Sequence, residues 1–140
     1  DEPRIISCSL HCEKNFPYRK QASDWDIALA KDCNDSEYLQ AVEQSLSSLL
    51  QWNQPELVLF DAGVDIHRDD ELGLLNISTQ ALYQRDLMVL QHCTARNIPV
   101  AAVIGGGYQR NVAALVQLHL QLFKAAFTLC GSDFAGKIET

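Results

Sequence analysis

Two polar side chains follow apolar runs at positions where an α/β sheet would bind a ligand. Asp65 comes shortly after the apolar residues 57–60, and Tyr108 follows the apolar residues 100–104. In an open α/β sheet, ligands bind where the carboxyl ends of the strands continue into loops. An aspartate at one such end and a tyrosine at another therefore indicate a chemical site at that edge of the sheet.

The turn that precedes Tyr108 contains three glycines, Gly105, Gly106 and Gly107. A dinucleotide-binding fingerprint would need a glycine where Arg110 stands, and a P-loop would need Gly-Lys followed by Ser or Thr, so both patterns fail. The glycines still allow the backbone to pass close to a ligand and to aim Tyr108 at it. A phosphate-binding loop and a tight surface turn both remain open for this segment.

Two groups of residues have the composition of a metal site. Asp65 and His67 form a local pair with further carboxylates nearby, and Cys8, His11 and Cys12 form another group. Catalytic zinc uses three protein ligands and an open position, and the chain offers Asp65 clearly but no obvious partners. A solvated acidic loop is the more common meaning of such a cluster, and the cysteine group lacks a second ligand pair at zinc-finger spacing.

These residues lie between alternating strands and helices. The apolar patterns predict strands at residues 4–9, 57–60 and 99–104, and helices at residues 34–51, 78–96 and 109–129. The wide apolar stripe of the last helix predicts that it is deeply packed, and residues 131–140 are expected to form a polar tail. The order predicts an α/β fold with a parallel sheet and right-handed crossovers.

Composition limits the classes of function. The chain has 140 residues, enough for one domain, and a net charge of −7, which argues against nucleic acid and anionic membranes as partners. The sequence shows no apolar run that we expect to span a bilayer. Five cysteines, an odd number, favour buried reduced thiols in a cytoplasmic protein over a disulfide framework.

Part of the sheet is expected to lie outside this sequence. Three strands are few for a parallel sheet, and the irregular stretches 10–34 and 62–77 are long for a small domain. The first residue is Asp1 and not Met, which is typical of a processed chain or of a piece of a longer one. The open sheet edges predict self-association.

At these same residues the chain resembles the histone deacetylase family, which includes acetoin-utilisation proteins and acetylpolyamine amidohydrolases. It is most similar to the bacterial members and to the class IV deacetylase. Nearly the whole chain apart from the tail takes part, through Ser9-Leu10-His11, Asn15-Phe16-Pro17, residues 23–27, residues 61–73, Arg85-Asp86, residues 98–100 and residues 105–108.

The resemblance implies a three-layer αβα, arginase-like fold and zinc-dependent hydrolysis of an N-acetyl amide such as acetyl-lysine or an acetylpolyamine. Asp65 would be one of three zinc ligands, and Tyr108 would donate its hydroxyl proton to the substrate carbonyl and stabilise the tetrahedral oxyanion. Phe16 would line the substrate channel, and Gly105, Gly106 and Gly107 would shape its floor. Ser9 and the carbonyl of Leu10 match a structural potassium site.

The resemblance also implies that much of the site lies elsewhere. The His-His pair and the Asp-x-His segment of the family do not occur in this sequence in a usable context. His67, in Asp65-Ile66-His67, does not take their place in the family pattern. Residues 1–130 therefore resemble the C-terminal part of a deacetylase domain, and we expect the chain alone to be inactive. Two alternatives stay open: a non-enzymatic half-domain that acts as an interaction module, and an α/β domain that binds phosphate or nucleotides.

Overall fold

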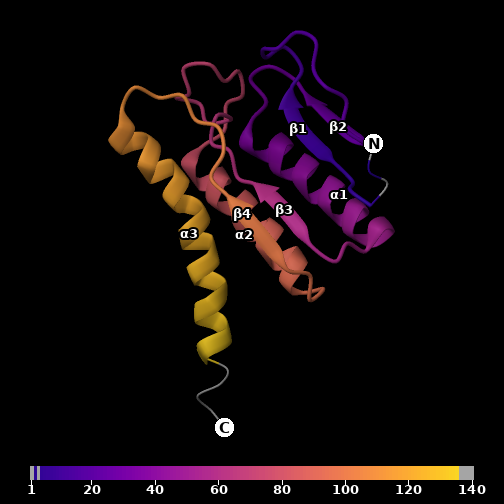
Figure 1. The fold of residues 1–140 in the computed structure, drawn as a ribbon. Coiled ribbons are helices and arrows are strands. Elements are labelled where there is room, and N and C mark those ends of the chain that lie inside the picture. The colour runs from indigo at the N-terminus through magenta and orange to yellow at the C-terminus, as the bar shows by residue number, and fades with distance from the viewer. Residues whose placement is uncertain (1, 3, 136–140) are drawn as a thin grey trace.

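A computed structural model of the chain describes residue 2 and residues 4–135, in which two strands are followed by helices that are separated by single strands (Figure 1). The elements are, in order, β1 (Cys8–Cys12), β2 (Trp25–Leu29), α1 (Asp35–Asn53), β3 (Val58–Asp61), α2 (Thr79–Thr94), β4 (Val100–Val103) and α3 (Val112–Ala135).

The strands form two separate parallel pairs. β1 pairs with β2, with Cys8 opposite Trp25, and β3 pairs with β4, with Val58 opposite Val100. This arrangement confirms the α/β class and the parallel pairing predicted from the sequence. It also confirms the partial character of the fold, because each sheet has only two strands in the described part of the chain.

Two predicted elements are placed differently in the structure, and one observed strand was not predicted. The first strand lies at Cys8–Cys12 and not at residues 4–9, because its position is set by pairing with β2. β2 itself was not predicted, although its residues alternate between less and more exposed positions. α3 continues to Ala135, so residues 131–135 of the expected polar tail are helical, and residues 136–140 lie outside the described residues.

Short polar contacts fix where α1 and α2 begin. Asn34 caps α1 and forms a reciprocal capping box with Glu37, as expected for an Asn at this position. The carboxylate of Asp35 accepts hydrogen bonds from the backbone N–H and the hydroxyl of Ser78, at 2.8 and 2.6 Å. Because Ser78 is the N-cap of α2, this carboxylate joins the starts of the two helices.

The core includes the loop that leaves β3. Val64 of that loop is fully buried together with Ile77, Ala81 and Leu82 at the start of α2. The apolar side chains thus fasten the strand end to the helix. The segment that carries Asp65 is therefore held by core packing on the residue before it.

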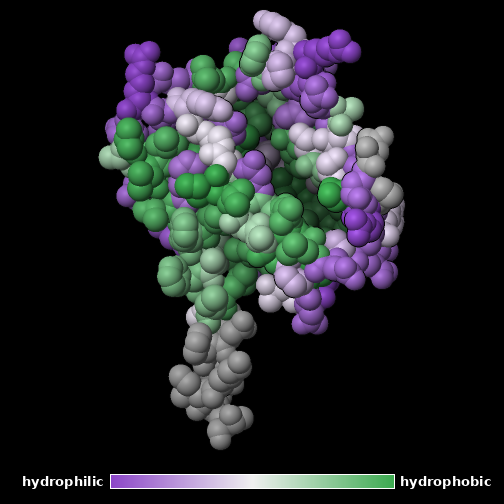
Figure 2. All heavy atoms as spheres, viewed as in Figure 1, coloured by the Kyte–Doolittle hydropathy of each residue, from purple (hydrophilic) through white to green (hydrophobic). Residues whose placement is uncertain are grey.

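One face of the molecule is apolar and open. Leu59 of β3 and Phe127 of α3 are each 77% exposed, and Val116 and Phe123 of α3 are also exposed. Figure 2 shows hydrophobic surface extending over α3 and the adjoining centre of the molecule. The prediction that α3 is deeply packed is therefore wrong for this side of the helix, which packs along α2 through its other side.

The residues Val112–Gly131 of α3 are long and apolar enough, by length and composition alone, to cross a membrane. We had expected no such run. A core helix of a soluble protein meets the same criterion, and a single helix of this kind is weak evidence for a membrane span.

The five cysteines are free thiols. Cys12, Cys33 and Cys93 are buried as expected, whereas Cys8 and Cys130 are exposed.

Candidate functional site

The ends of β3 and β4 bring the two predicted site loops together. Asp61 pairs with Val103 at the last position of the parallel ladder, so both loops leave the same edge of the sheet. Beyond that point the backbone of Ala62 donates to Val103, at 2.9 Å, and that of Val64 donates to Gly106, at 2.6 Å. The predicted juxtaposition of the Asp65 segment with the glycine turn is therefore present.

The glycines of this turn allow the two loops to approach closely. A Cβ atom added to Gly106 would lie 2.6 Å from the Oδ2 atom of Asp65, and one added to Gly105 would overlap the carboxylate of Asp61. None of the described glycines has a positive φ, so the turn uses glycine for space and not for a left-handed backbone. Two carboxylates against the turn also argue against the phosphate-binding alternative, because they repel an anion.

Asp70 holds the backbone that carries Tyr108. Its Oδ1 atom accepts the N–H groups of Leu72 and Gly73, at 2.9 and 2.7 Å, and its Oδ2 atom accepts the N–H of Tyr108, at 2.7 Å. The backbone of Glu71 also donates to the carbonyl of Tyr108, at 3.3 Å. One buried carboxylate thus fixes its own loop and the position of the half-exposed tyrosine.

Arg85 of α2 binds the backbone of the loop that carries Asp65. Its side chain is 5% exposed, and its Nη1 atom donates to the carbonyl of Gly63 at 2.6 Å. Its Nε and Nη2 atoms both lie 2.8 Å from the Oδ1 atom of Asp86, and its guanidinium lies 5.6 Å from the centre of the Phe60 ring. Because Gly63 stands two residues before Asp65, this buried ion pair anchors the start of the Asp65 segment.

His67 stabilises its own loop through hydrogen bonds and does not form a metal-ligand pair with Asp65. It is buried, its Nδ1 atom accepts the N–H of Asp69 at 3.2 Å, and its Nε2 atom lies 3.1 Å from the hydroxyl of Thr79. Burial lowers the pKa of this imidazole, which therefore stays neutral near pH 7. Both ring nitrogens are occupied, so the local metal pair considered for Asp65 and His67 is not formed.

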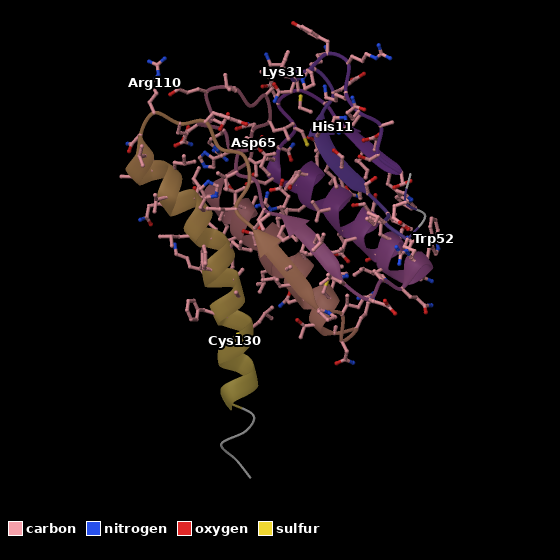
Figure 3. The ribbon with its side chains drawn as sticks, viewed as in Figure 1. His11, Lys31, Trp52, Asp65, Arg110 and Cys130 are labelled. Atoms are coloured by element: carbon pink, nitrogen blue, oxygen red, sulfur yellow. The ribbon has the colours of Figure 1, made fainter. Side chains whose placement is uncertain are left out.

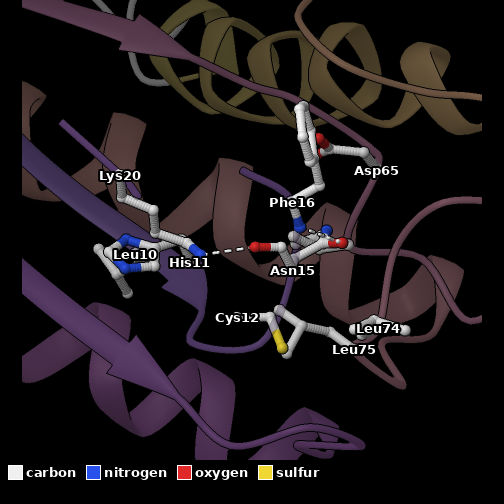
Figure 4. A pocket seen from close by; sticks show the side chains of 10 residues that line it. Leu10, His11, Cys12, Asn15, Phe16, Lys20, Asp65, Leu74 and Leu75 are labelled. Carbon is white, nitrogen blue, oxygen red and sulfur yellow. Dashed lines mark hydrogen bonds between the residues drawn. The ribbon is translucent and has the colours of Figure 1, made fainter. Parts of the chain in front are cut away.

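Asp65 and His11 both line a pocket of about 160 Å³, which Asp65 enters from the loop after β3 and His11 from β1 (Figures 3 and 4). The pocket is lined by residues 10–12 of β1, by Asn15, Phe16 and Lys20 of the next loop, and by Asp65, Ile66, Leu74 and Leu75. It brings together Asp65, Phe16 and Leu10 from the predicted site residues. Tyr108 and the glycine turn are not among the lining residues, and they adjoin Asp65 through the contacts described above.

The metal ligands expected at this site are only partly present. The Asp65 carboxylate lies against the Gly106 backbone and lines the pocket, a position from which it can supply one metal ligand. The described residues contain no group of three His, Cys, Asp or Glu side chains that could hold an ion. A catalytic zinc needs three protein ligands, so the described residues alone do not complete the site. At the predicted potassium position, the hydroxyl of Ser9 lies 3.0 Å from the Nδ1 atom of His11.

Burial raises the pKa of Asp65, and the negative charge of Asp70 raises it further. The backbone N–H of Asp65 and the charge of Arg85 act in the opposite direction without reversing the shift. A carboxylate in this position is destabilised in its charged form and therefore favours a nearby cation or proton.

Sequence reasoning missed two residues that hold the site loops, Asp70 and Arg85, and one that lines the pocket, Lys20. Asp70 and Arg85 belong to the motifs of the resemblance, but no role was assigned to either of them. Their roles depend on contacts with Tyr108, 38 residues away, and with Gly63, 22 residues away, which spacing alone does not reveal. Lys20, which lies in the loop after β1, gave no signal in the sequence.

Comparison with known proteins places the chain in a family. The histone deacetylase domain family matches residues 1–123. An uncharacterized protein of Picosynechococcus sp. is 46% identical over 126 residues, covering 90% of this chain and 42% of that protein. Histone deacetylase 2 of Arabidopsis thaliana is 29% identical over 119 residues, covering 83% of this chain and 31% of that protein.

The fold agrees with a solved structure as well. The acetylpolyamine aminohydrolase from Burkholderia pseudomallei superposes with a TM-score of 0.70 at 17% identity, covering 87% of this chain and 38% of the other. The fold class predicted from the sequence is thereby confirmed. The match of the family model to residues 1–123 shows that the chain belongs to the histone deacetylase domain family. It spans between 31% and 42% of the length of these proteins.

We expect Asp65→Asn to raise the free energy of unfolding at pH 7 in metal-free buffer. The pKa of Asp65 in the folded state lies above its usual value of 3.8, so the parent protein loses stability as the pH rises through the folded-state pKa. The asparagine does not ionise, and its advantage should shrink on acidification and vanish below about pH 3.8. Denaturant unfolding between pH 3 and 8 measures this difference. The control is Glu56→Gln, which removes a carboxylate from an exposed position. A variant no more stable than the parent at pH 7 would contradict the prediction.

Asp70→Asn should destabilise the protein by about 1–3 kcal/mol. Both carboxylate oxygens of Asp70 accept backbone N–H groups, and the asparagine replaces one of these oxygens with an NH₂ group that cannot accept a hydrogen bond. Asp69→Asn is the matched control, since the side chain of Asp69 is 74% exposed, and its effect should stay within about 0.5 kcal/mol. Urea unfolding of both variants measures the difference. Equal effects of the two substitutions would show that Asp70 does not hold the Tyr108 backbone.

Proposed function

We propose that the protein to which this chain belongs is a zinc-dependent hydrolase of N-acetyl amides. The observation that carries the proposal is the joining of the Asp65 and Tyr108 loops at one sheet edge, through Val64 to Gly106 and through Asp70 to Tyr108. Membership of the histone deacetylase domain family supports the reaction class. The name of the Burkholderia pseudomallei relative supports acetylated polyamines, beside acetyl-lysine, as substrates.

Each residue has a chemical role in this proposal. The carboxylate of Asp65 supplies one oxygen ligand for the metal, and the remaining ligands come from outside the described residues. Zinc, when bound, polarises the amide carbonyl and lowers the pKa of the attacking water. Tyr108 donates its hydroxyl hydrogen bond to the carbonyl oxygen as negative charge develops there. Phe16 contacts the aliphatic stem of the substrate, and Gly105, Gly106 and Gly107 form the channel floor.

The positions of these groups suit a donor that acts mainly in the transition state. Because Asp70 holds the backbone N–H of Tyr108, the phenol is carried by a fixed segment and needs little reorganisation when charge develops. Ser9 and the carbonyl of Leu10 are proposed to bind potassium behind this edge. That ion would stabilise the loop after β1 and would take no part in the reaction.

The exposed apolar face supports a second candidate, a non-enzymatic half-domain that binds a partner. Leu59, Phe127 and their neighbours leave a large apolar surface uncovered, and surfaces of this kind mark interaction sites. The two candidates differ in what the gene encodes. A His-His pair and an Asp-x-His segment upstream of these residues would favour the enzyme, and their absence from the full reading frame would favour the interaction module.

Tyr108→Phe in the full-length protein should lower kcat for an acetyl-lysine substrate about 100- to 1,000-fold with little change in KM. The hydroxyl contributes to the charge that develops in the transition state and adds little to the ground-state complex. The control is Tyr83→Phe, whose hydroxyl bonds Thr128 between α2 and α3, away from the site. A Tyr108→Phe enzyme with unchanged kcat would rule out the oxyanion role.

The 140-residue chain alone is expected to turn over no acetyl-lysine substrate and to bind zinc weakly. It supplies Asp65 where a catalytic zinc needs three ligands. A fluorogenic deacetylase assay and a zinc titration in competition with a chelator measure both properties. Robust turnover by the purified chain would overturn this expectation.

A further inference from the structure

Lys20 binds the carbonyl groups of its own loop. Its Nζ atom donates to the backbone carbonyls of Glu13, Asn15 and Pro17, at 3.0, 2.6 and 3.2 Å. A lysine ammonium has three N–H donors and no acceptor, so these three carbonyls satisfy it completely. Hydrogen bonds from a charged donor are stronger than neutral ones. The ammonium therefore acts as an internal cation at the centre of the loop between β1 and β2.

This loop carries Phe16 to the edge of the Asp65 pocket. Lys20, Phe16 and Asp65 all line that pocket, and Figure 4 shows the Lys20 ammonium bonded to the Asn15 carbonyl beside them. Phe16 is 82% exposed, so packing of its ring does little to hold it in place. Its position depends on the backbone, where the three carbonyls bound by Lys20 lie on both sides of Phe16 in the sequence.

We propose that Lys20 is a positioning residue that fixes the Phe16 wall of the pocket entrance and thereby determines how tightly the substrate stem is bound. This inference rests on the proposed function of the pocket. A preorganised wall lowers the conformational entropy that is lost when the stem binds. Its contribution is the same in the ground state and the transition state, so Lys20 affects KM and leaves kcat nearly unchanged.

The first test measures the order of the loop in the full-length protein and needs no activity. Lys20→Met keeps an unbranched side chain only one heavy atom shorter but removes its charge and its donors. Hydrogen exchange should then become faster at Glu13, Asn15 and Phe16, whose N–H groups are bonded to Leu29, Cys12 and the Asn15 side chain. Exchange in α1 and α2 should be unchanged. Lys14→Met, an exposed lysine of the same loop, is the matched control and should exchange like the parent.

The second test measures deacetylation kinetics with the same variants. Lys20→Met should raise KM about three- to tenfold while kcat changes less than about twofold. Lys20→Arg retains the charge with a planar arrangement of donors, and its KM should fall between those of the parent and Lys20→Met.

Two results would overturn the proposal: unchanged exchange in the loop of Lys20→Met, or faster exchange with an unchanged KM in an active enzyme. If the full-length parent hydrolyses no acetyl amide, the proposed function fails and the entrance role fails with it. The exchange measurement then still shows whether Lys20 holds the loop, so the two failures are distinguishable.

Discussion

The parallel pairing of β3 with β4 is the constraint on which the site depends. Its ladder ends at Asp61 opposite Val103, and the bond from Val64 to Gly106 carries the contact beyond the strands. Parallel strands present their carboxyl ends at the same edge, so one register determines which loop residues meet. A shift of this register by one residue would move the Asp65 segment away from the glycine turn and turn every side chain of the strand to the opposite face.

The same loops belong to the site and to the core. Val64 is buried beside Asp65, and Arg85 is held by Asp86 while it binds the carbonyl of Gly63. Breaking such a buried ion pair is strongly destabilising because it leaves a charge without its partner. The position of Asp65 is therefore determined by the stability of α2 and its ion pair, and substitutions at Arg85 would alter structure and chemistry together.

Periodicity in the sequence predicted the helices and strands that have strong local signals. Contacts between residues far apart in the sequence could be found only from the structure. The predicted helix starts at residues 34 and 78 match the observed N-caps Asn34 and Ser78, because caps are local. The strand at Cys8–Cys12 was misplaced because the β-branched Ile5 and Ile6 carry a strand signal, whereas pairing with β2 decides where a strand forms. Asp65 and Tyr108 were found as candidates because each follows an apolar run, but their support by Asp70 and Arg85 depends on three-dimensional contacts. The roles assigned to Asp65 and Tyr108 remain predictions.

The charge distribution around Asp65 gives a physical reason to expect a cation there. Burial raises the pKa of Asp65, the negative charges of Asp70 and Asp61 add to this effect, and the charge of Arg85 only partly offsets it. The guanidinium of Arg85 also forms an ion pair with Asp86, at 2.8 Å. A bound divalent ion would be the largest local charge and would reverse this balance, because it stabilises the ionised carboxylate that burial disfavours. In a metal site built from several segments, a ligand carboxylate should be destabilised in its charged form when the metal and the other ligands are missing. The raised pKa of Asp65 in this chain agrees with that expectation.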